Sequence, residues 1–222
     1  MLTDAKKKEL LVFYTIVQTN KCSLRELSQV LSIPKRTIKE IIRKLNGTIF
    51  QQLSIPRFIY STAKGELKLD SQHKDEKMAI FHYIKLFFLR ESNRFNFLLL
   101  LFDSPHSRVS KKILLEKLYI SPSYLEKLTN QLNKSLKKFH LQIISRQNCY
   151  ILKGDELSIR IYMYFFFSDA FQGIDWPLTN MKLSQVKHTH LSNELLMTKK
   201  TSKIQEKVYL LVAIFLMRSA HH

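Results

Sequence analysis

The sequence contains few of the residues that build loops and covalent cross-links. Its 222 residues include only 4 Gly, 5 Pro and 2 Cys. So few Gly and Pro argue against long flexible linkers and against a glycine-rich phosphate-binding loop. The two cysteines, Cys22 and Cys149, form no spacing pattern. We therefore expect reduced thiols in a cytoplasmic protein rather than a disulfide framework.

Long apolar runs and catalytic motifs are also missing. The longest apolar run, Val208–Met217, has ten residues, whereas a membrane span needs roughly 18, and the first residues lack the apolar segment of a signal peptide. No nucleophile elbow, phosphate loop or metalloprotease motif occurs. His188 and His190 have no carboxylate or Cys at ligand spacing. We expect a protein that is not an enzyme, holds no metal or cofactor, and has no membrane partner.

Acidic residues are scarce relative to basic ones, and the imbalance is uneven. The chain has 36 Lys and Arg against 18 Asp and Glu, a net charge of +18. Residues 1–70 carry net +7, residues 71–154 carry net +9, and residues 155–222 carry net +2. A charge needed only for solubility would be spread evenly, whereas a surface that neutralises phosphates concentrates it. The first two thirds of the chain are therefore predicted to bind a polyanion.

A block of sequence occurs twice, 87 residues apart. The copies are Ser23–Asn46 and Ser110–Asn133. The two copies share identical residues at the pairs Ser23/Ser110, Leu27/Leu114, Leu31/Leu118, Ile33/Ile120, Leu45/Leu132 and Asn46/Asn133. Each copy predicts a short helix, a tight turn and a longer helix, which is the layout that presents a helix to the major groove of DNA.

The first copy contains the signals that begin and turn its helices. Ser23 with Glu26 predicts a capping box, and Ser32-Ile33-Pro34 predicts the turn. The longer helix, 35–45, is apolar on one face, and Asn46-Gly47 is predicted to end it. The opposite face and the hairpin that follows supply the expected DNA contacts, which are Lys35, Arg36, Thr37, Lys39, Arg43, Lys44, Arg57 and Lys64. Arginines suit base edges or phosphates and lysines suit phosphates, although a solvated surface is the alternative.

The second copy has a milder outer face. Ser121-Pro122 predicts the cap and first residue of its longer helix. The expected DNA contacts are Ser123, Lys127, Asn130 and Lys134, and they suit either base reading or a backbone clamp, with a purely structural partner as the alternative. A hairpin is predicted after each copy, from 58–60 with 66–69 and from 142–145 with 149–152. Three helices followed by a hairpin make a winged helix-turn-helix.

The last part of the chain differs from the two repeats. Residues 155–171 form an unusually aromatic helix, which favours a core or a subunit interface over a base-stacking platform. A final helix is predicted over 202–218. The predicted fold is mainly α, with winged helix-turn-helix domains at 1–72 and 73–154 and a partial helical regulatory domain at 155–222.

This layout resembles the paired N-terminal DNA-binding domains of the Mga/AtxA-type regulators of Gram-positive bacteria. The exit from the second wing, Lys153-Gly154-Asp155-Glu156 followed by Ile159-Arg160, is similar to that family's, and so is Asp175-Trp176-Pro177. The resemblance implies that the last helix opens a phosphotransferase-type regulatory domain, so that phosphotransferase-system proteins are expected partners. It also implies that the chain is a fragment and that His221 or His222, if native, corresponds to a regulatory phosphohistidine.

The predicted function is regulation of transcription, with activation as the expected sign, through binding of double-stranded DNA. An RNA-binding antiterminator is one alternative, although the major groove of A-form RNA is too narrow for a helix. A protein-interaction scaffold that uses helix-turn-helix folds as adaptors is the other. The aromatic helix hints at a homo-oligomer. The target site, the signal and the oligomeric state stay open at this point.

Overall fold

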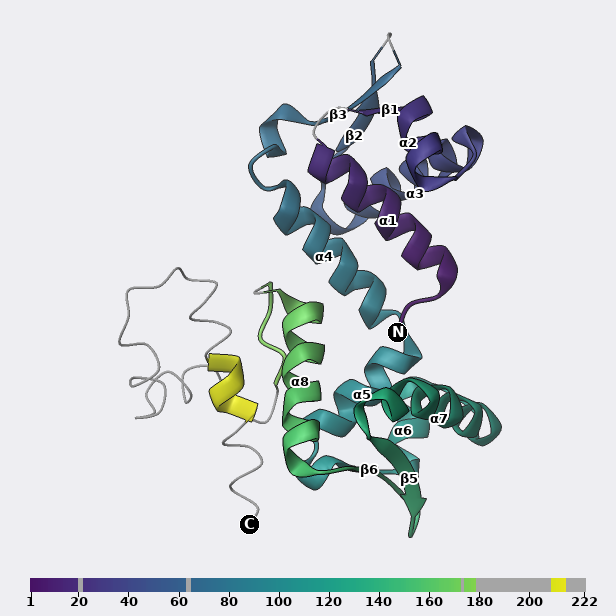
Figure 1. Cartoon of the computed structure of the whole chain (residues 1–222), viewed down its shortest axis with the longest axis vertical. Coiled ribbons are helices and arrows are strands. Elements are labelled where there is room, and N and C mark those ends of the chain that lie inside the picture. The colour runs from purple at the N-terminus through teal and green to yellow at the C-terminus, as the bar shows by residue number, and fades with distance from the viewer. Residues whose placement is uncertain (20–21, 63–64, 173, 179–208, 215–222) are drawn as a thin grey trace. The chain divides into compact units, whose positions relative to one another are not determined.

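A computed structural model describes residues 1–19, 22–62, 65–172, 174–178 and 209–214. The chain forms two compact units, Met1–Leu89 and Arg90–His222, and each is described by itself. Helices dominate both units (Figure 1), so the prediction of a mainly α fold is confirmed. Among the residues so described, no helix combines the length and the hydropathy needed to cross a bilayer.

The first unit places three helices before a small antiparallel sheet. Its elements are α1 (Asp4–Thr19), β1 (Cys22–Ser23), α2 (Leu24–Leu31), α3 (Lys35–Leu53), β2 (Ile59–Ser61), β3 (Glu66–Leu69), the 3-10 turn η1 (Ser71–His73) and α4 (Lys77–Arg90). The strand order is β1-β3-β2, with Tyr60 opposite Lys68 in the wing and Cys22 opposite Leu67 at its edge. The predicted hairpin is confirmed, whereas the two-residue strand β1 was not predicted.

The helix-turn-helix of this unit forms as its local sequence indicates. The Ser23 hydroxyl accepts a hydrogen bond from the backbone N–H of Glu26 at 3.1 Å, and the Glu26 carboxylate accepts one from the backbone N–H of Ser23 at 2.8 Å. The predicted capping box is therefore confirmed. At the other end of α2, Ser32 takes the left-handed conformation, and the N–H of Ile33 bonds to the carbonyl of Ser28. This bond is the signature of a Schellman-type helix end.

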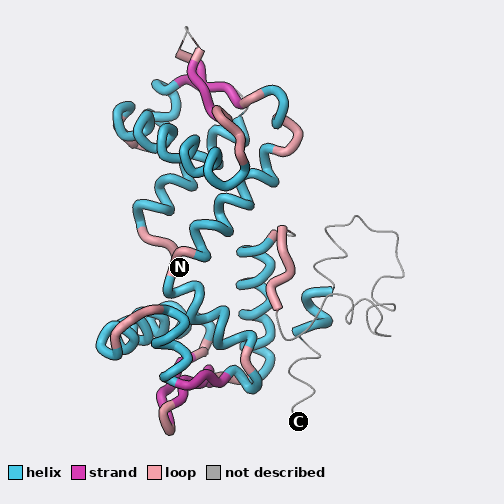
Figure 2. Tube along the Cα trace, turned by 180° about the vertical axis from the view of Figure 1, so that it is seen from behind, coloured by secondary structure: helices cyan, strands magenta, loops and turns pink. Residues whose placement is uncertain are grey.

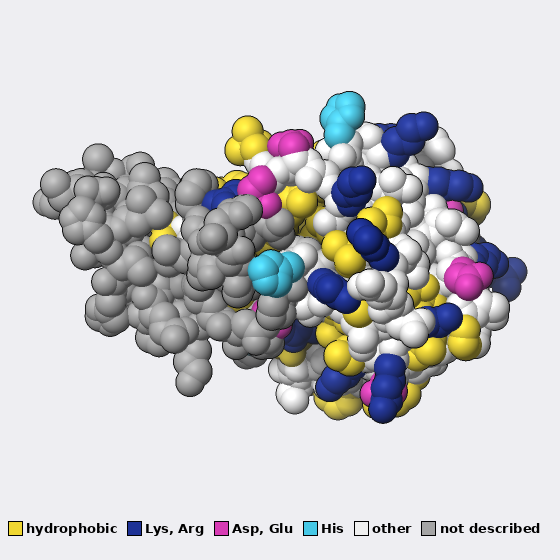
Figure 3. Space-filling model, turned by 90° about the horizontal axis from the view of Figure 1, so that it is seen from below, with side chains coloured by type: hydrophobic (Ala, Val, Ile, Leu, Met, Phe, Trp, Pro, Cys, Tyr) yellow, Lys and Arg dark blue, Asp and Glu magenta, His cyan; other side chains and the backbone are white. Residues whose placement is uncertain are grey.

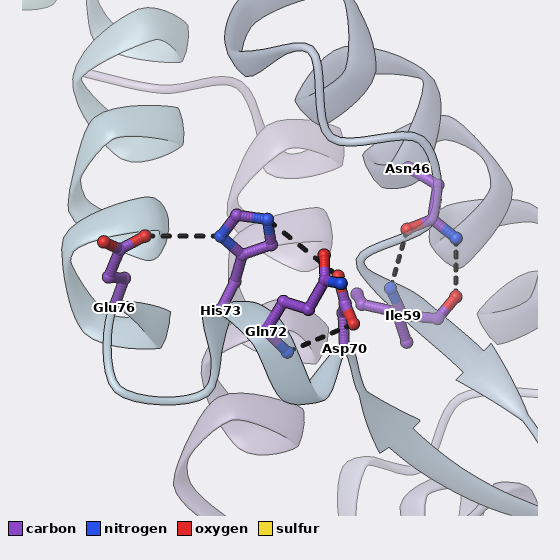
Figure 4. Close-up of polar contacts among 6 residues, drawn as sticks. All are labelled: Asn46, Ile59, Asp70, Gln72, His73 and Glu76. Atoms are coloured by element: carbon purple, nitrogen blue, oxygen red, sulfur yellow. Dashed lines mark hydrogen bonds and ion pairs between the residues drawn. The ribbon is translucent and has the colours of Figure 1, made fainter.

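The prediction that Asn46-Gly47 ends the longer helix is wrong, because α3 continues to Leu53. The Asn46 side chain does not cap the helix but bridges it to the wing (Figure 4). Its amide donates to the carbonyl of Ile59 at 2.7 Å, and its oxygen accepts from the N–H of Ile59 at 2.9 Å. The helix ends instead where Ser54 turns left-handed.

The exit from the wing leads into α4 through a short polar joint. The Asp70 carboxylate accepts a hydrogen bond from the N–H of Gln72 at 3.3 Å. The His73 ring lies between two carboxylates, with Nδ1 3.3 Å from Glu76 and Nε2 3.9 Å from Asp70 (Figure 4). These contacts hold the chain as it turns from the sheet to the next helix.

The core of the first unit includes α4. The ring of Phe13 on α1 lies at the centre, edge-on to Phe58 at 6.0 Å and to Phe81 of α4 at 5.4 Å. Ile84 and Phe88 continue the buried face of α4 in the same cluster. This helix, which the predicted division at residue 72 gave to the second domain, thus buries its apolar side in the first compact unit. The three-domain division itself stays a prediction.

The second unit repeats the element order of the first. Its elements are α5 (Asn93–Asp103), the 3-10 turn η2 (Pro105–Ser107), β4 (Arg108–Ser110), α6 (Lys111–Leu118), α7 (Pro122–Leu136), the 3-10 turn η3 (Lys137–Phe139), β5 (Gln142–Arg146), β6 (Cys149–Lys153) and α8 (Glu156–Phe171). The strand order β4-β6-β5 matches that of the first sheet, and Figure 2 shows the strands of each unit gathered beside its helices. Gln147 and Asn148 both have positive φ at the hairpin tip, as a type I′ turn requires.

The 87-residue repeat is preserved in the bonding of the second unit. The N–H of Ile120 bonds to the carbonyl of Leu115, one repeat after the Ile33–Ser28 bond of the first unit. Asn133 bridges α7 to the wing as Asn46 does in α3, donating to the Ile143 carbonyl at 2.9 Å and accepting from its N–H at 2.7 Å. The repeated sequence therefore encodes two winged helix-turn-helix units with the same internal clamp.

The aromatic helix α8 packs into the second unit. Its Phe166 ring stacks on Phe95 of α5 at 5.0 Å, and Phe167 meets Phe102 edge-on at 5.9 Å. The Asp155 carboxylate caps the helix by accepting from the N–H of Ser158 at 3.0 Å, which gives a physical role to the wing-exit sequence. The predicted final helix over 202–218 is described only at 209–214, where the chain is helical. His188, His190, His221 and His222 lie outside the described residues.

Candidate nucleic-acid interface

The helix α3 separates an apolar face from a basic one. Ile38, Ile41 and Leu45 are buried on the inner side. The outer side carries the exposed cations Lys35, Arg36, Lys39, Arg43 and Lys44. Thr37 is half-buried, and Arg57 is exposed just before the wing. Lys64 lies outside the described residues. A helix anchored by one face and charged on the other can enter a groove without disturbing its own core.

One acidic residue lies on the basic face of α3. The Glu40 carboxylate is 3.5 Å from Nε of Arg36, and the Arg36 side chain is 92% exposed. An exposed pair with i,i+4 spacing contributes only about 0.3–0.5 kcal/mol. The guanidinium is therefore free to leave Glu40 for a phosphate or a base edge at little cost.

Lys35, Arg36 and Lys39 of α3 line an open concavity of about 670 Å³ together with residues of α2 and the wing. It is lined by Ser23, Leu24, Arg25, Lys35, Arg36, Lys39, Glu40 and Gly65. These residues come from the start of α2, the first turns of α3 and the turn of the wing. The concavity therefore holds four cationic side chains against one carboxylate. Arg25 was missed by the sequence reasoning, which considered only the longer helix and the hairpin.

Two backbone N–H groups at the start of α2, beside this concavity, are already hydrogen-bonded within the capping box. The pKa of Glu26 lies below its ordinary value, first because the backbone N–H of Ser23 bonds to its carboxylate and second because of the Ser23 side chain. The carboxylate of Glu26 and the hydroxyl of Ser23 thus each satisfy one backbone N–H, that of Ser23 and that of Glu26. The side chains of Arg25, Lys35, Arg36 and Lys39 supply the positive charge that attracts an anion to this site.

The second unit has a concavity at the equivalent place. It measures about 440 Å³ and is lined by Ser110, Lys111, Lys112, Leu115, Glu116 and Asn148. Ser110 and Lys112 occupy the positions of Ser23 and Arg25 one repeat later. The tip of the wing borders this concavity, and it is joined to the start of α6 by a hydrogen bond from the N–H of Lys111 to the carbonyl of Asn148 at 2.7 Å. Lys111 and Lys112 were also missed by the sequence reasoning.

The outer face of α7 carries less charge than that of α3. The predicted contacts Ser123, Lys127, Asn130 and Lys134 are all exposed, but none of them lines the concavity of the second unit. Figure 3 views the second unit, where Lys and Arg side chains are spread over the described surface and acidic ones are sparser. The cations of this unit therefore form a diffuse field, whereas those of the first unit converge.

Comparison with known proteins finds two matches to this chain. Residues 79–167 match the Mga helix-turn-helix domain. The chain is also similar to a protein of Streptococcus pneumoniae serotype 4 (strain ATCC BAA-334 / TIGR4) named "Putative trans-acting regulator", with 21% identity over 155 residues. That alignment covers 70% of this chain, and the chain spans only 29% of the length of the relative. The two matches confirm the resemblance seen in the wing exit and the repeated helix-turn-helix.

Proposed function

We propose that this chain, which is similar to the Mga-type transcription regulators, acts by binding duplex DNA, with α3 as the main reading helix. The observation that carries the proposal is the convergence of Arg25, Lys35, Arg36 and Lys39 on one concavity. In a winged helix-turn-helix the longer helix enters the major groove, and flanking groups hold the backbone. Arg36 and Arg43 suit base edges, while Arg25 and the lysines suit phosphates.

The second unit has the features of a DNA-binding unit that contacts mainly the backbone. Its concavity and the exposed side chains of Lys127 and Lys134 suit contacts to the DNA backbone. Backbone contacts fix the register of a protein on the duplex without reading sequence. The second unit then adds affinity and position, and α3 supplies most of the discrimination between sequences.

A swap of the two helix faces tests this division. The triple variant Arg36→Ser, Lys39→Glu, Arg43→Asn gives α3 the residues that α7 carries at the same positions. Binding to a mixed-sequence 30-bp duplex is measured by fluorescence anisotropy at several salt concentrations. Each phosphate that the protein no longer neutralises should make the slope of log K against log salt less negative by about 0.9, and affinity at low salt should fall by roughly 100-fold or more.

The control is Lys8→Glu, which makes the same charge change as Lys39→Glu at an exposed site of α1. It should leave the slope within error of the wild type. The control changes the net charge by −2 and the triple variant by −4. A reduction in the control half as large as that in the triple variant would show that only net charge matters and would refute a reading helix. Selection from duplexes with a randomised centre then shows whether α3 reads sequence, because Arg36→Ala should relax the preference at particular positions.

The same assay separates the alternatives. A hairpin RNA that displaces the duplex at equal concentration would favour an antiterminator. Binding to a protein partner that survives the triple charge change would favour a scaffold. Activation is the sign we propose from the family resemblance, and loss of reporter expression on deletion of the gene would support it. A cytoplasmic location, homo-oligomer formation and contact with phosphotransferase-system proteins remain predictions.

A further inference from the structure

An exposed tyrosine marks the turn of the second helix-turn-helix. The Tyr119 side chain is 93% exposed, between α6 and α7. Its backbone takes the left-handed conformation, with φ 52° and ψ 47°. A residue with a Cβ is strained there, and a bulky one especially so. The ring is solvent-exposed, so packing does not offset this strain.

A second tyrosine lies in the first turn of the neighbouring helix. Tyr124 follows the Ser121 cap, and its side chain is 43% exposed. Tyr119 and Tyr124 occupy the positions of Ser32 and Thr37 in the first unit. Within the described part of the chain, neither tyrosine hydroxyl makes a hydrogen bond. The second unit thus presents two long, neutral donors where the first presents short hydroxyls.

The surroundings of this tyrosine pair indicate a polyanion as its partner. Lys117 and Lys127 are exposed on either side of the pair in the sequence. Residues 90–154, in which this helix-turn-helix lies, carry 12 Lys and Arg against 4 Asp and Glu. The face of α7 nevertheless lacks the cations of α3, with Ser123 in place of Arg36 and Asn130 in place of Arg43. A tyrosine hydroxyl is among the groups that donate to phosphate oxygens in protein–DNA interfaces.

We propose that Tyr119 and Tyr124 hold the second unit on duplex DNA by donating hydrogen bonds to backbone phosphates. This proposal rests on the proposed function and extends it to residues outside the charged set. A neutral donor adds affinity without releasing a counterion, so it leaves the salt dependence of binding unchanged. The affinity contributed by the first unit then falls steeply as the salt concentration rises, whereas the affinity contributed by the tyrosine pair does not change with salt.

The test compares Tyr119→Phe and Tyr124→Phe with Lys127→Ala on the mixed-sequence 30-bp duplex, at 50 to 200 mM salt. Each Phe variant removes one hydroxyl and should weaken binding by about 5-fold at every salt concentration, with an unchanged slope. Lys127→Ala, which removes a cation, should instead make the slope of log K against log salt less negative by about 0.9. Phe variants that bind like the wild type, or that change the slope, would overturn the proposal.

A glycine variant separates binding from folding. Tyr119→Gly removes the side chain and suits the left-handed backbone, so the unfolding temperature of this unit should rise by about 2–5 °C while DNA binding falls as far as in Tyr119→Phe. A fall in both would assign Tyr119 a structural role and overturn the proposal. If the wild type itself binds no duplex, both the proposed function and this inference fail. Wild-type binding that the Phe variants retain removes the tyrosine proposal alone.

Discussion

The paired asparagine clamps give the sharpest prediction for stability. In each unit one Asn side chain makes two hydrogen bonds to the first wing strand, from Asn46 to Ile59 and from Asn133 to Ile143, at 2.7–2.9 Å. A net value of about 0.5–1.5 kcal/mol per bond gives 1–3 kcal/mol for each clamp. The bonds are only partly buried, so water relieves some of the penalty on the freed backbone groups. We expect Asn→Ala at either position to cost about 2 kcal/mol.

The two clamps can be measured separately in the same molecule. Trp176 is the single tryptophan of the chain and belongs to the second compact unit. Asn133→Ala should therefore lower the thermal midpoint followed by tryptophan fluorescence, by roughly 5–10 °C for a unit of this size. Asn46→Ala should lower a midpoint seen by circular dichroism and leave the fluorescence transition in place.

Asn130→Ala is the matched control, since it removes an exposed Asn from the same helix as Asn133. A surface change of this kind should stay within about 0.5 kcal/mol of the wild type. The reasoning is refuted if Asn133→Ala costs no more than Asn130→Ala. It is also refuted if Asn46→Ala shifts the tryptophan transition as far as Asn133→Ala does.

Three further substitutions probe the backbone and the capping box. Gly47→Ala should stabilise the first unit by about 0.5–1 kcal/mol in urea unfolding, because a Cβ there meets nothing within 4 Å inside a helix. Gly154→Ala should destabilise the second unit by about 1–3 kcal/mol, because its Cβ would lie 2.3 Å from the buried Leu141 side chain. If both substitutions stabilised their units, or both destabilised them, the geometry would be contradicted. Hydrogen bonding lowers the pKa of Glu26 from about 4.5, so the stability lost in Glu26→Ala should be largest above pH 4.5 and shrink as the pH falls through the folded value. A difference that stays constant from pH 6 to 3 would rule this out.

Sequence reasoning succeeded where the signal was local. The capping box at Ser23, the turn at Ser32-Ile33-Pro34 and the hairpin from 142–145 with 149–152 each depend on residues within a few positions of one another. The repeat added the topology, because two copies of one pattern predict two copies of one fold. These signals fixed the elements that carry α3 and its basic face.

The errors came from interactions between residues far apart in the chain. Asn46-Gly47 is a local stop signal, but the side chain of Asn46 is held by Ile59, so the helix runs on. The strand β1 has two residues, too few for any periodicity, and exists because it pairs with β3. Arg25 belongs to the site only because folding brings the start of α2 beside α3 and the wing.

The packing of α4 has a consequence for dividing the chain by protein engineering. The segment shared with the Mga helix-turn-helix domain begins at residue 79, inside a helix whose Phe81, Ile84 and Phe88 are buried in the core of the first unit. A fragment that starts at residue 79 would carry these side chains into water without their partners. A fragment that stops at residue 72 would leave Phe13 uncovered. The segment that matches the family and the segment that packs together are therefore offset by one helix. A cut at residue 72 or at residue 79 would expose apolar side chains on both fragments, whereas a cut between residues 89 and 90 leaves each core intact.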